Sequence, residues 1–155
     1  MATSGPYVVS VQAATPRGIA GVRARLNISR VPGVFRTYLD RVYAAARQQA
    51  LQLDGHSIFL YESVPATAGD VDVTFGVGSP TPFPLTDGIT YVTLPVGTVA
   101  TTTHRGPYTA LGDAHAAVID WCRGQGHVLT GTRWEVYGHW SPDEPPRTDV
   151  FYLLV

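Results

Sequence analysis

The two halves of this 155-residue chain repeat one order of strand and helix patterns. In each half, two strand-like runs come first, a run with helical spacing follows, and two more strand-like runs end the half. This order predicts two ββαββ units, over about residues 5–78 and 88–155, joined by a linker at 79–87. The linker contains three prolines within residues 80–84, and these disfavour regular structure.

The spacing of apolar residues defines the elements of each half. Apolar residues occupy every second position over 22–28, which is typical of a strand, and recur at helical intervals from Phe35 until a stop near Gly55. The predicted elements of the first half are strands at 7–12, 22–28, 57–63 and 71–77 and a helix at 35–53. Those of the second half are strands at 89–94, 98–104, 133–138 and 148–154 and a helix at 108–122.

A nearly constant offset links the two halves. Gly33 and Glu62 recur 73 positions later as Gly106 and Glu135, so the start of the helix and a glutamate after an aromatic residue keep one register. The offset rises to 77 in the last strand of each half. We therefore expect residues 1–155 to form one α+β domain, with two pseudo-symmetric ββαββ units, a curved antiparallel sheet, one helix per unit and a central ligand cleft.

Composition and charge exclude several classes of protein. The formal net charge is −1, with 11 basic and 12 acidic residues, and this balance gives no basic surface for direct nucleic-acid binding or for an anionic membrane. The longest apolar stretches have the length of strands, and no basic segment leads into an apolar one at the N-terminus, so we expect a cytoplasmic protein. Cys122 is the only cysteine and no HExxH pattern occurs, so neither a metal nor another cofactor is expected.

The segment around Glu135 is the most informative for chemistry. In a strand, Glu135 and Tyr137 share one face and Trp134 and Val136 share the other. If Trp134 and Val136 pack under the helix, Glu135 points away from it. A glutamate in a strand is more often a solvated surface residue, but the recurrence as Glu62 and the aromatic neighbours make a functional role an equal alternative here.

A carboxylate among aromatic rings has two physical uses. It can pair with a cation whose flat apolar body stacks on the rings, or its pKa can rise on burial so that it serves as a general acid or base. His115 lies on the apolar stripe of the second helix, where a hydrogen-bonded core imidazole is expected rather than a ligand-binding residue.

Several short motifs occur in a recognisable order: HRGPY at 104–108, WEVY at 134–137 and TDVF at 148–151, with VPG at 31–33 and DVDV at 70–73 in the first half. This order resembles that of the GyrI-like family, which includes the effector-binding domains of bacterial multidrug-responsive transcription activators. The resemblance covers almost the whole chain. It implies a pseudo-symmetric fold and an aromatic-lined pocket with an acidic residue at its base that favours lipophilic cations.

The resemblance also implies roles for individual residues. Glu135 matches the acidic base, and Tyr108 and Tyr137 match positions that line the pocket. No helix-turn-helix pattern precedes the first strand, so we expect a stand-alone member that does not itself bind DNA. Other stand-alone relatives bind gyrase, and some hydrolyse strained cyclopropane-containing natural products with pocket glutamate and aromatic residues.

The leading hypothesis is a stand-alone protein that binds or sequesters lipophilic, cationic aromatic compounds. The alternative is a hydrolase that opens strained cyclopropane-containing compounds, with Glu135, together with Glu62, as general acid or base. Little in the sequence supports gyrase as a partner, since no exposed amphipathic segment or acidic tail occurs. The candidate ligand-binding residues are Glu135, Tyr137, Tyr108, Trp134, Tyr91, Tyr38 and Tyr152.

Overall fold

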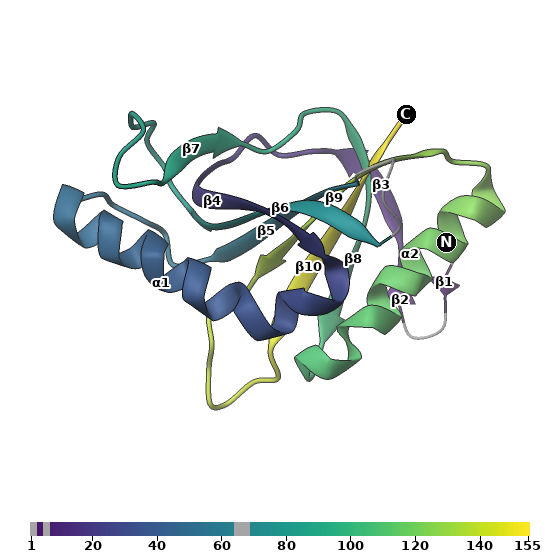
Figure 1. Ribbon diagram of the computed structural model, residues 1–155. Helices are drawn as coiled ribbons and strands as arrows, with labels where there is room; N and C mark the ends of the chain where they lie inside the picture. The colour runs from purple at the N-terminus through teal and green to yellow at the C-terminus, as the bar shows by residue number, and fades with distance from the viewer. Residues whose placement is uncertain (1–2, 5–6, 64–68) are drawn as a thin grey trace. The chain divides into compact units, whose positions relative to one another are not determined.

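A computed structural model describes residues 3–4, 7–63 and 69–155. The chain forms two compact units. Unit 1 contains Met1–Thr15 and Pro95–Val155, and unit 2 contains Pro16–Leu94. The predicted α+β class, with an antiparallel sheet and one helix in each unit, is confirmed (Figure 1).

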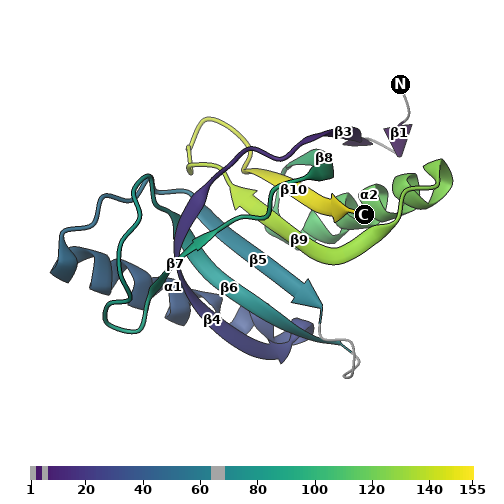
Figure 2. The same cartoon turned by 90° about the horizontal axis from the view of Figure 1, so that it is seen from above.

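Unit 2 is a four-stranded antiparallel sheet covered by one helix. Its strands follow the order β5-β6-β4-β7, and α1 lies behind β4 and β6 in Figure 2. The side chains of Val42 and Ala45 on α1 pack against Ala20, Val22 and Val77 of the sheet. The elements are β4 (Gly18–Asn27), a 3-10 turn (Ile28–Arg30), α1 (Val31–Gln49), β5 (Ser57–Ser63), β6 (Asp70–Gly78) and β7 (Thr90–Thr93).

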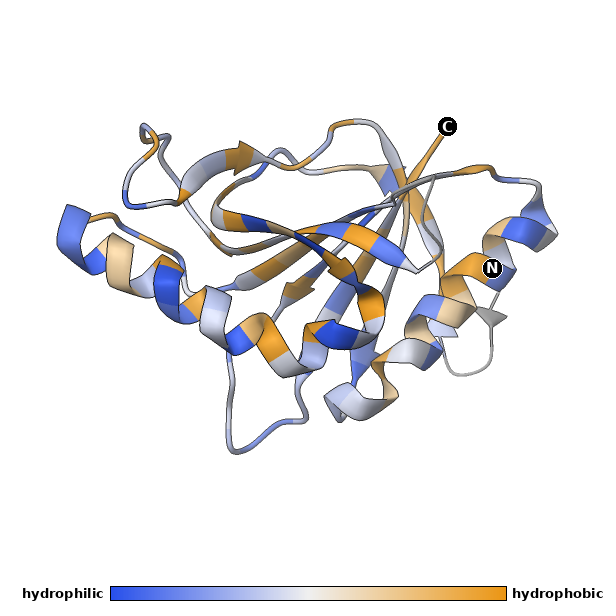
Figure 3. Cartoon of the chain, in the orientation of Figure 1, coloured by the Kyte–Doolittle hydropathy of each residue, from blue (hydrophilic) through white to orange (hydrophobic). Residues whose placement is uncertain are grey.

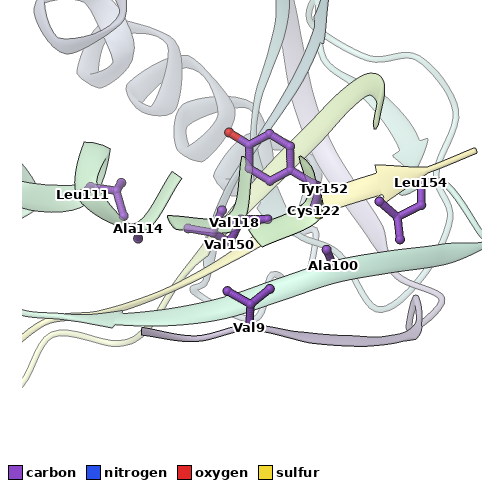
Figure 4. Packing of buried hydrophobic residues seen from close by; sticks show 9 residues of the cluster. All are labelled: Val9, Ala100, Leu111, Ala114, Val118, Cys122, Val150, Tyr152 and Leu154. Atoms are coloured by element: carbon purple, nitrogen blue, oxygen red, sulfur yellow. The ribbon is translucent and has the colours of Figure 1, made fainter. Parts of the chain in front are cut away.

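Unit 1 repeats this arrangement. Its strands follow the order β3-β8-β10-β9, and Val118 of α2 lies against Val150 of β10 (Figure 4). The core is built from buried residues of α2, β8 and β10. The elements are β1 (Thr3–Ser4) paired with β2 (Tyr7–Val8), β3 (Ser10–Ala13), β8 (Thr98–Arg105), a 3-10 turn (Tyr108–Ala110), α2 (Leu111–Gln125), β9 (Leu129–Tyr137) and β10 (Arg147–Leu154).

The first strand of each sequence half lies in the sheet of the other half. β3 pairs with β8, with Ser10 opposite Thr101. β7 pairs with β4, with Gly18 opposite Thr93. The two strands predicted at 7–12 and 22–28 therefore both form, but they do not pair with each other.

Helix α1 begins and ends earlier than the predicted range of 35–53. It begins at Val31, because Pro32 is well suited to the first turn, where the missing N–H costs no hydrogen bond. It ends at Gln49 because Ala50 adopts a left-handed conformation with φ of 55°. Leu53 lies beyond the helix, yet it packs against the same core, which explains why its position fitted the helical stripe.

The inferred offset of 73 between the helix starts is wrong, because α1 begins at Val31 and α2 at Leu111, 80 positions later. Gly33 lies within the first turn of α1, whereas Gly106 precedes the 3-10 turn with φ of 134°. The two glycines therefore serve different purposes, and their matching positions are coincidental.

Both helices carry hydrophilic and hydrophobic residues, as expected for helices that cover one face of a sheet and expose the other side to solvent (Figure 3). Among the described residues, no helix combines the length and the hydrophobicity that a membrane span requires.

Candidate functional site

Glu135 lies on the face of the unit 1 sheet that α2 covers. It stands directly opposite Val150, which packs against α2, and directly paired residues of antiparallel strands share a face. The residue is 5% exposed. The expectation that Glu135 points away from the helix is therefore wrong, because Trp134, and not Glu135, lies on the other face, where it stacks on Phe151.

Hydrogen bonds surround the Glu135 carboxyl group. His115 Nε2 of α2 lies 2.6 Å from Oε2, and the Tyr137 hydroxyl donates to Oε1 at 2.9 Å. The other ring nitrogen of His115, Nδ1, lies 2.7 Å from the Tyr152 hydroxyl. A continuous chain of hydrogen bonds thus runs from Tyr137 through Glu135 and His115 to Tyr152.

The two tyrosines remain neutral at physiological pH. Burial raises the pKa of Tyr137 far above its ordinary value, and the neighbouring Glu135 raises it further. Burial also raises the pKa of Tyr152 to about 12. Each hydroxyl therefore keeps its proton and can donate it in a hydrogen bond.

The hydrogen-bond pattern is complete with a neutral imidazole. If Nε2–H of His115 donates to Glu135, then Nδ1 accepts from the Tyr152 hydroxyl, and every donor has an acceptor. In this state the chain of groups carries the single negative charge of Glu135.

Tyr108 gives this group of residues an exposed edge. Its ring centroid lies 5.5 Å from that of Tyr137, at an angle of 57°, and the residue is 49% exposed. Thr148, opposite Tyr137 in the neighbouring strand, is fully buried, and its hydroxyl has no hydrogen-bond partner among the described residues. We call Glu135, His115, Tyr137, Tyr152 and Tyr108 the Glu135 cluster.

The turn before Tyr108 depends on a glycine. Gly106 has φ of 134°, which is available almost only to glycine, and the next carbonyl, that of Pro107, accepts a hydrogen bond from His104 Nε2 at 2.9 Å. This turn leads from β8 to the 3-10 turn that begins at Tyr108.

Replacing Gly106 with alanine is expected to lower the free energy of unfolding by about 1–3 kcal/mol, because any other residue is strained at this φ. Denaturant unfolding measures the change. Gly33→Ala is the matched control: a Cβ at Gly33 meets nothing within 4 Å, and alanine there is expected to stabilise α1 by about 0.5–1 kcal/mol. Equal effects of the two substitutions would contradict the assigned role of Gly106.

The other aromatic candidates lie outside the Glu135 cluster. Trp134 is 3% exposed and lies on the opposite face of the sheet. Tyr38 and Tyr91 belong to unit 2, where Tyr38 stacks on Phe75 with ring centroids 4.8 Å apart and Tyr91 covers Gly18.

Glu62 does not occupy the position that corresponds to Glu135. When the last strands are aligned, Val73 of β6 matches Val150 of β10, and the residue opposite Val73 is Tyr61. Glu62 is one position further, so its side chain points to the other face, where it lies 3.7 Å from Arg23 and is 42% exposed. The counterpart of Glu135 in unit 2 is therefore a buried tyrosine.

His115 was not among the candidate site residues. Its position on the apolar stripe of α2 indicated a buried imidazole with hydrogen-bond partners, and the structure confirms those partners. The sequence carried no signal that one of them would be Glu135, because the two residues lie on different elements. Among the described residues, no group of three histidine, cysteine or acidic side chains converges as a metal site.

A groove also occurs in unit 1, but the Glu135 cluster does not line it. Its described lining includes Thr101, Thr103 and Phe151, and directly paired residues place Phe151 on the same face as Trp134. The groove and the Glu135 cluster are therefore separate features on opposite faces of one sheet.

Comparison with known proteins identifies the family. The sequence model of the GyrI-like small molecule binding domain matches residues 8–153. The chain belongs to this GyrI-like family. No curated protein is similar enough in sequence to count as a match.

Solved structures share this GyrI-like fold over nearly the whole chain. The EcmrR C-terminal domain has a TM-score of 0.76 and 18% identity, with coverage of 97% of this chain and 98% of that chain. SAV2435 bound to tetraphenylphosphonium has a TM-score of 0.68 and 12% identity, with coverage of 96% and 94%. A hydrolase from Listeria innocua has a TM-score of 0.61 and 12% identity, with coverage of 95% and 91%. At these identities the similarity establishes the fold.

Proposed function

We propose that this GyrI-like domain binds lipophilic, cationic aromatic compounds at the Glu135 cluster. The observation that carries the proposal is a glutamate only 5% exposed, whose carboxyl group is held by a tyrosine hydroxyl and an imidazole beside the half-exposed residue Tyr108. A buried carboxylate attracts positive charge more strongly than one in water, because the surroundings screen it less. The structural similarity to SAV2435, which was solved with tetraphenylphosphonium, supports this ligand class.

Each member of the Glu135 cluster has a role in this proposal. Glu135 supplies the negative charge, and Tyr137 orients the carboxyl group through its hydroxyl. The rings of Tyr108 and Tyr137 provide apolar surface and cation–π attraction, each such contact contributing on the order of 0.5–2 kcal/mol. His115 holds the carboxyl group through a hydrogen bond and leaves its negative charge available to a bound cation.

The proposal is tested by titrating the protein with tetraphenylphosphonium and measuring either the change in tryptophan fluorescence or the heat of binding. Glu135→Gln preserves the shape of the side chain and removes its charge. We expect this substitution to weaken binding by at least about tenfold, because a charge-assisted interaction contributes about 1.5–3 kcal/mol. Equal affinity of the two proteins, or no binding by either, would contradict the proposal.

Two controls separate charge from shape. Tetraphenylborate has nearly the same bulk and the opposite charge, so its binding should be weaker in the wild type and improve in Glu135→Gln. Glu62→Gln removes an exposed carboxylate of unit 2 and should leave both affinities unchanged. A loss of tetraphenylphosphonium binding in Glu62→Gln as large as that in Glu135→Gln would assign the effect to net charge alone.

The hydrolase that opens strained rings is the second candidate. The observation that favours it is the hydrogen-bonded chain from Glu135 through His115 to Tyr152, which resembles the proton-relay arrangements of general acid–base catalysis. In this reaction Glu135 accepts a proton from water as the oxygen attacks a ring carbon. The strained C–C bond breaks, and the carbon that leaves with the electron pair takes the proton that Glu135 accepted, which regenerates the carboxylate.

Turnover distinguishes catalysis from binding. A cyclopropane-containing DNA alkylator is incubated with substoichiometric protein, and the water adduct is measured by mass spectrometry. Product in molar excess over protein, absent with Glu135→Gln, would support the hydrolase. Product formation at the buffer rate would leave binding as the function.

A further inference from the structure

The face of the unit 1 sheet that points away from α2 carries a groove with a volume of about 570 Å³. This volume falls within the range of about 300–1,000 Å³ that small-molecule sites have. The described residues that line it come from β2, β3, β8 and β10: Tyr7, Val8, Ser10, Gln12, Thr101, Thr102, Thr103, Arg105, Arg147, Asp149 and Phe151.

Rows of directly paired residues define the floor of the groove. Ser10 lies opposite Thr101, and Thr101 lies opposite Phe151, so these three side chains form one row across three strands. Arg105 and Arg147 form another row, four positions further along β8 and β10. Because a strand rises about 3.3 Å per residue, the arginine row lies about 13 Å from the Phe151 row.

The arginine row holds an excess of positive charge. Arg147 Nε lies 3.2 Å from Asp149 Oδ1, and a second nitrogen of the same guanidinium lies 3.4 Å from Oδ2. Thr103 donates to the same carboxylate at 2.8 Å. The guanidinium of Arg105 makes neither a hydrogen bond nor an ion pair with any residue that the structure describes. One guanidinium of the row is therefore neutralised and the other is not.

Arg105 and Arg147 are both exposed to solvent, where a ligand can reach them. Like charges directly opposite each other on neighbouring strands destabilise a sheet, and the single carboxylate nearby compensates only Arg147. A planar guanidinium with five N–H donors is well suited to bind a carboxylate or a phosphate group. The hydroxyl groups of Ser10 and Thr101 lie in the Phe151 row and add neutral hydrogen-bonding groups beside the apolar ring.

We propose that this groove is a second ligand site, which binds an elongated molecule with an oxyanion at one end and a flat apolar body at the other. Arg105 binds the carboxylate or phosphate group, and Phe151 supports the apolar body. Phe151 is itself held by the stack on Trp134, with ring centroids 5.6 Å apart. The site does not depend on the Glu135 cluster, which lies on the other face and selects the opposite charge.

The test uses 1-naphthyl phosphate and 1-naphthoate as probes, with 1-naphthylmethanol as the neutral analogue. Binding is measured by the shifts of backbone amide signals in NMR spectra of the whole protein. Both anions are expected to shift the amides of Ser10, Thr101 and Thr103, and the neutral analogue to bind at least about tenfold more weakly. The anion that binds more tightly identifies the preferred head group, phosphate or carboxylate.

Substitutions test whether Arg105 supplies the positive charge that binds the anion. Arg105→Gln is expected to weaken anion binding by about tenfold, and Arg105→Lys, which keeps the charge but not the planar fork, by less. Arg123→Gln is the control, because Arg123 lies on α2 and is 77% exposed. Glu135→Gln should bind the anions like the wild type, so a failure of the proposed cation site leaves this test unaffected.

The proposal would be overturned by the absence of any shift at millimolar probe, by equal affinity for the neutral analogue, or by unchanged anion binding in an Arg105→Gln variant that keeps its fold. Shifts confined to the Glu135 cluster would also contradict it, since they would place the anion on the other face of the sheet.

Discussion

Replacing Trp134 with alanine is expected to lower the free energy of unfolding by about 3–5 kcal/mol, the usual cost of removing a large buried aromatic side chain. Trp134 is 3% exposed and stacks on Phe151 with an interplanar angle of 17°. Its loss removes this contact and leaves a cavity that the surrounding strands cannot fill without moving. Unfolding in denaturant, followed by far-ultraviolet circular dichroism, measures the effect.

The control for this prediction is another tryptophan. Trp140 is 75% exposed, and Trp140→Ala should change the free energy of unfolding by no more than about 0.5 kcal/mol. Trp134→Phe, which keeps a buried ring, should retain tetraphenylphosphonium affinity because residue 134 lies on the face opposite Glu135. If Trp134→Phe folds but loses as much tetraphenylphosphonium affinity as Glu135→Gln does, Trp134 is part of the binding site.

Replacing His115 with phenylalanine is expected to lower the free energy of unfolding by about 1.5–3 kcal/mol at neutral pH, because the buried Glu135 carboxylate loses a charge-assisted hydrogen bond. In wild type, His115 lies 2.6 Å from Glu135 and 2.7 Å from the Tyr152 hydroxyl, so the substitution disrupts both contacts. Urea unfolding of the variant measures the effect.

A double-mutant cycle separates the energy of the Glu135–His115 hydrogen bond from the energy of packing the His115 ring. Glu135→Leu combined with His115→Phe removes both partners, and the double variant should be more stable than the sum of the single effects predicts. The double variant should still be less stable than the wild type, because the hydroxyls of Tyr137 and Tyr152 lose Glu135 and His115 as hydrogen-bond acceptors. Additive single effects would show that the Glu135–His115 contact contributes nothing to stability.

Local sequence patterns predicted the elements of the fold well but not their partners. The alternation in 22–28 and the helical spacing after Phe35 reflect interactions within a few residues, and both elements form. The pairing of β3 with β8 joins residues about 90 positions apart, such as Ser10 and Thr101. Two alternating runs separated by a turn look the same whether they pair with each other or with distant strands.

The candidate site was predicted in part. Glu135 and its tyrosine neighbours were found because an acidic residue between aromatic residues is unusual in a strand. The face was predicted incorrectly because Trp134 and Glu135 are both buried, so apolar character alone did not indicate which of them faces the helix. The inferred match of Glu62 to Glu135 failed because a one-residue difference in register reverses the direction of every side chain.

The exchange of β3 and β7 between the halves has a consequence for how this chain can be divided. Cleavage in the proline-rich segment at 79–87 would place β4 and β7 on two different fragments. The hydrogen bonds between these two strands do not depend on the cleaved bond and would be kept. The resulting fragments would be interlocked, because each would contribute a strand to the other's sheet. Unit 2, in contrast, is continuous, and Leu94 donates a backbone hydrogen bond to Arg17 where its ends meet. In topological terms unit 2 is an insertion within unit 1. The natural places to cut and rejoin this chain are therefore next to Thr15 and Pro95, and not in the segment at 79–87 that separates the two sequence halves.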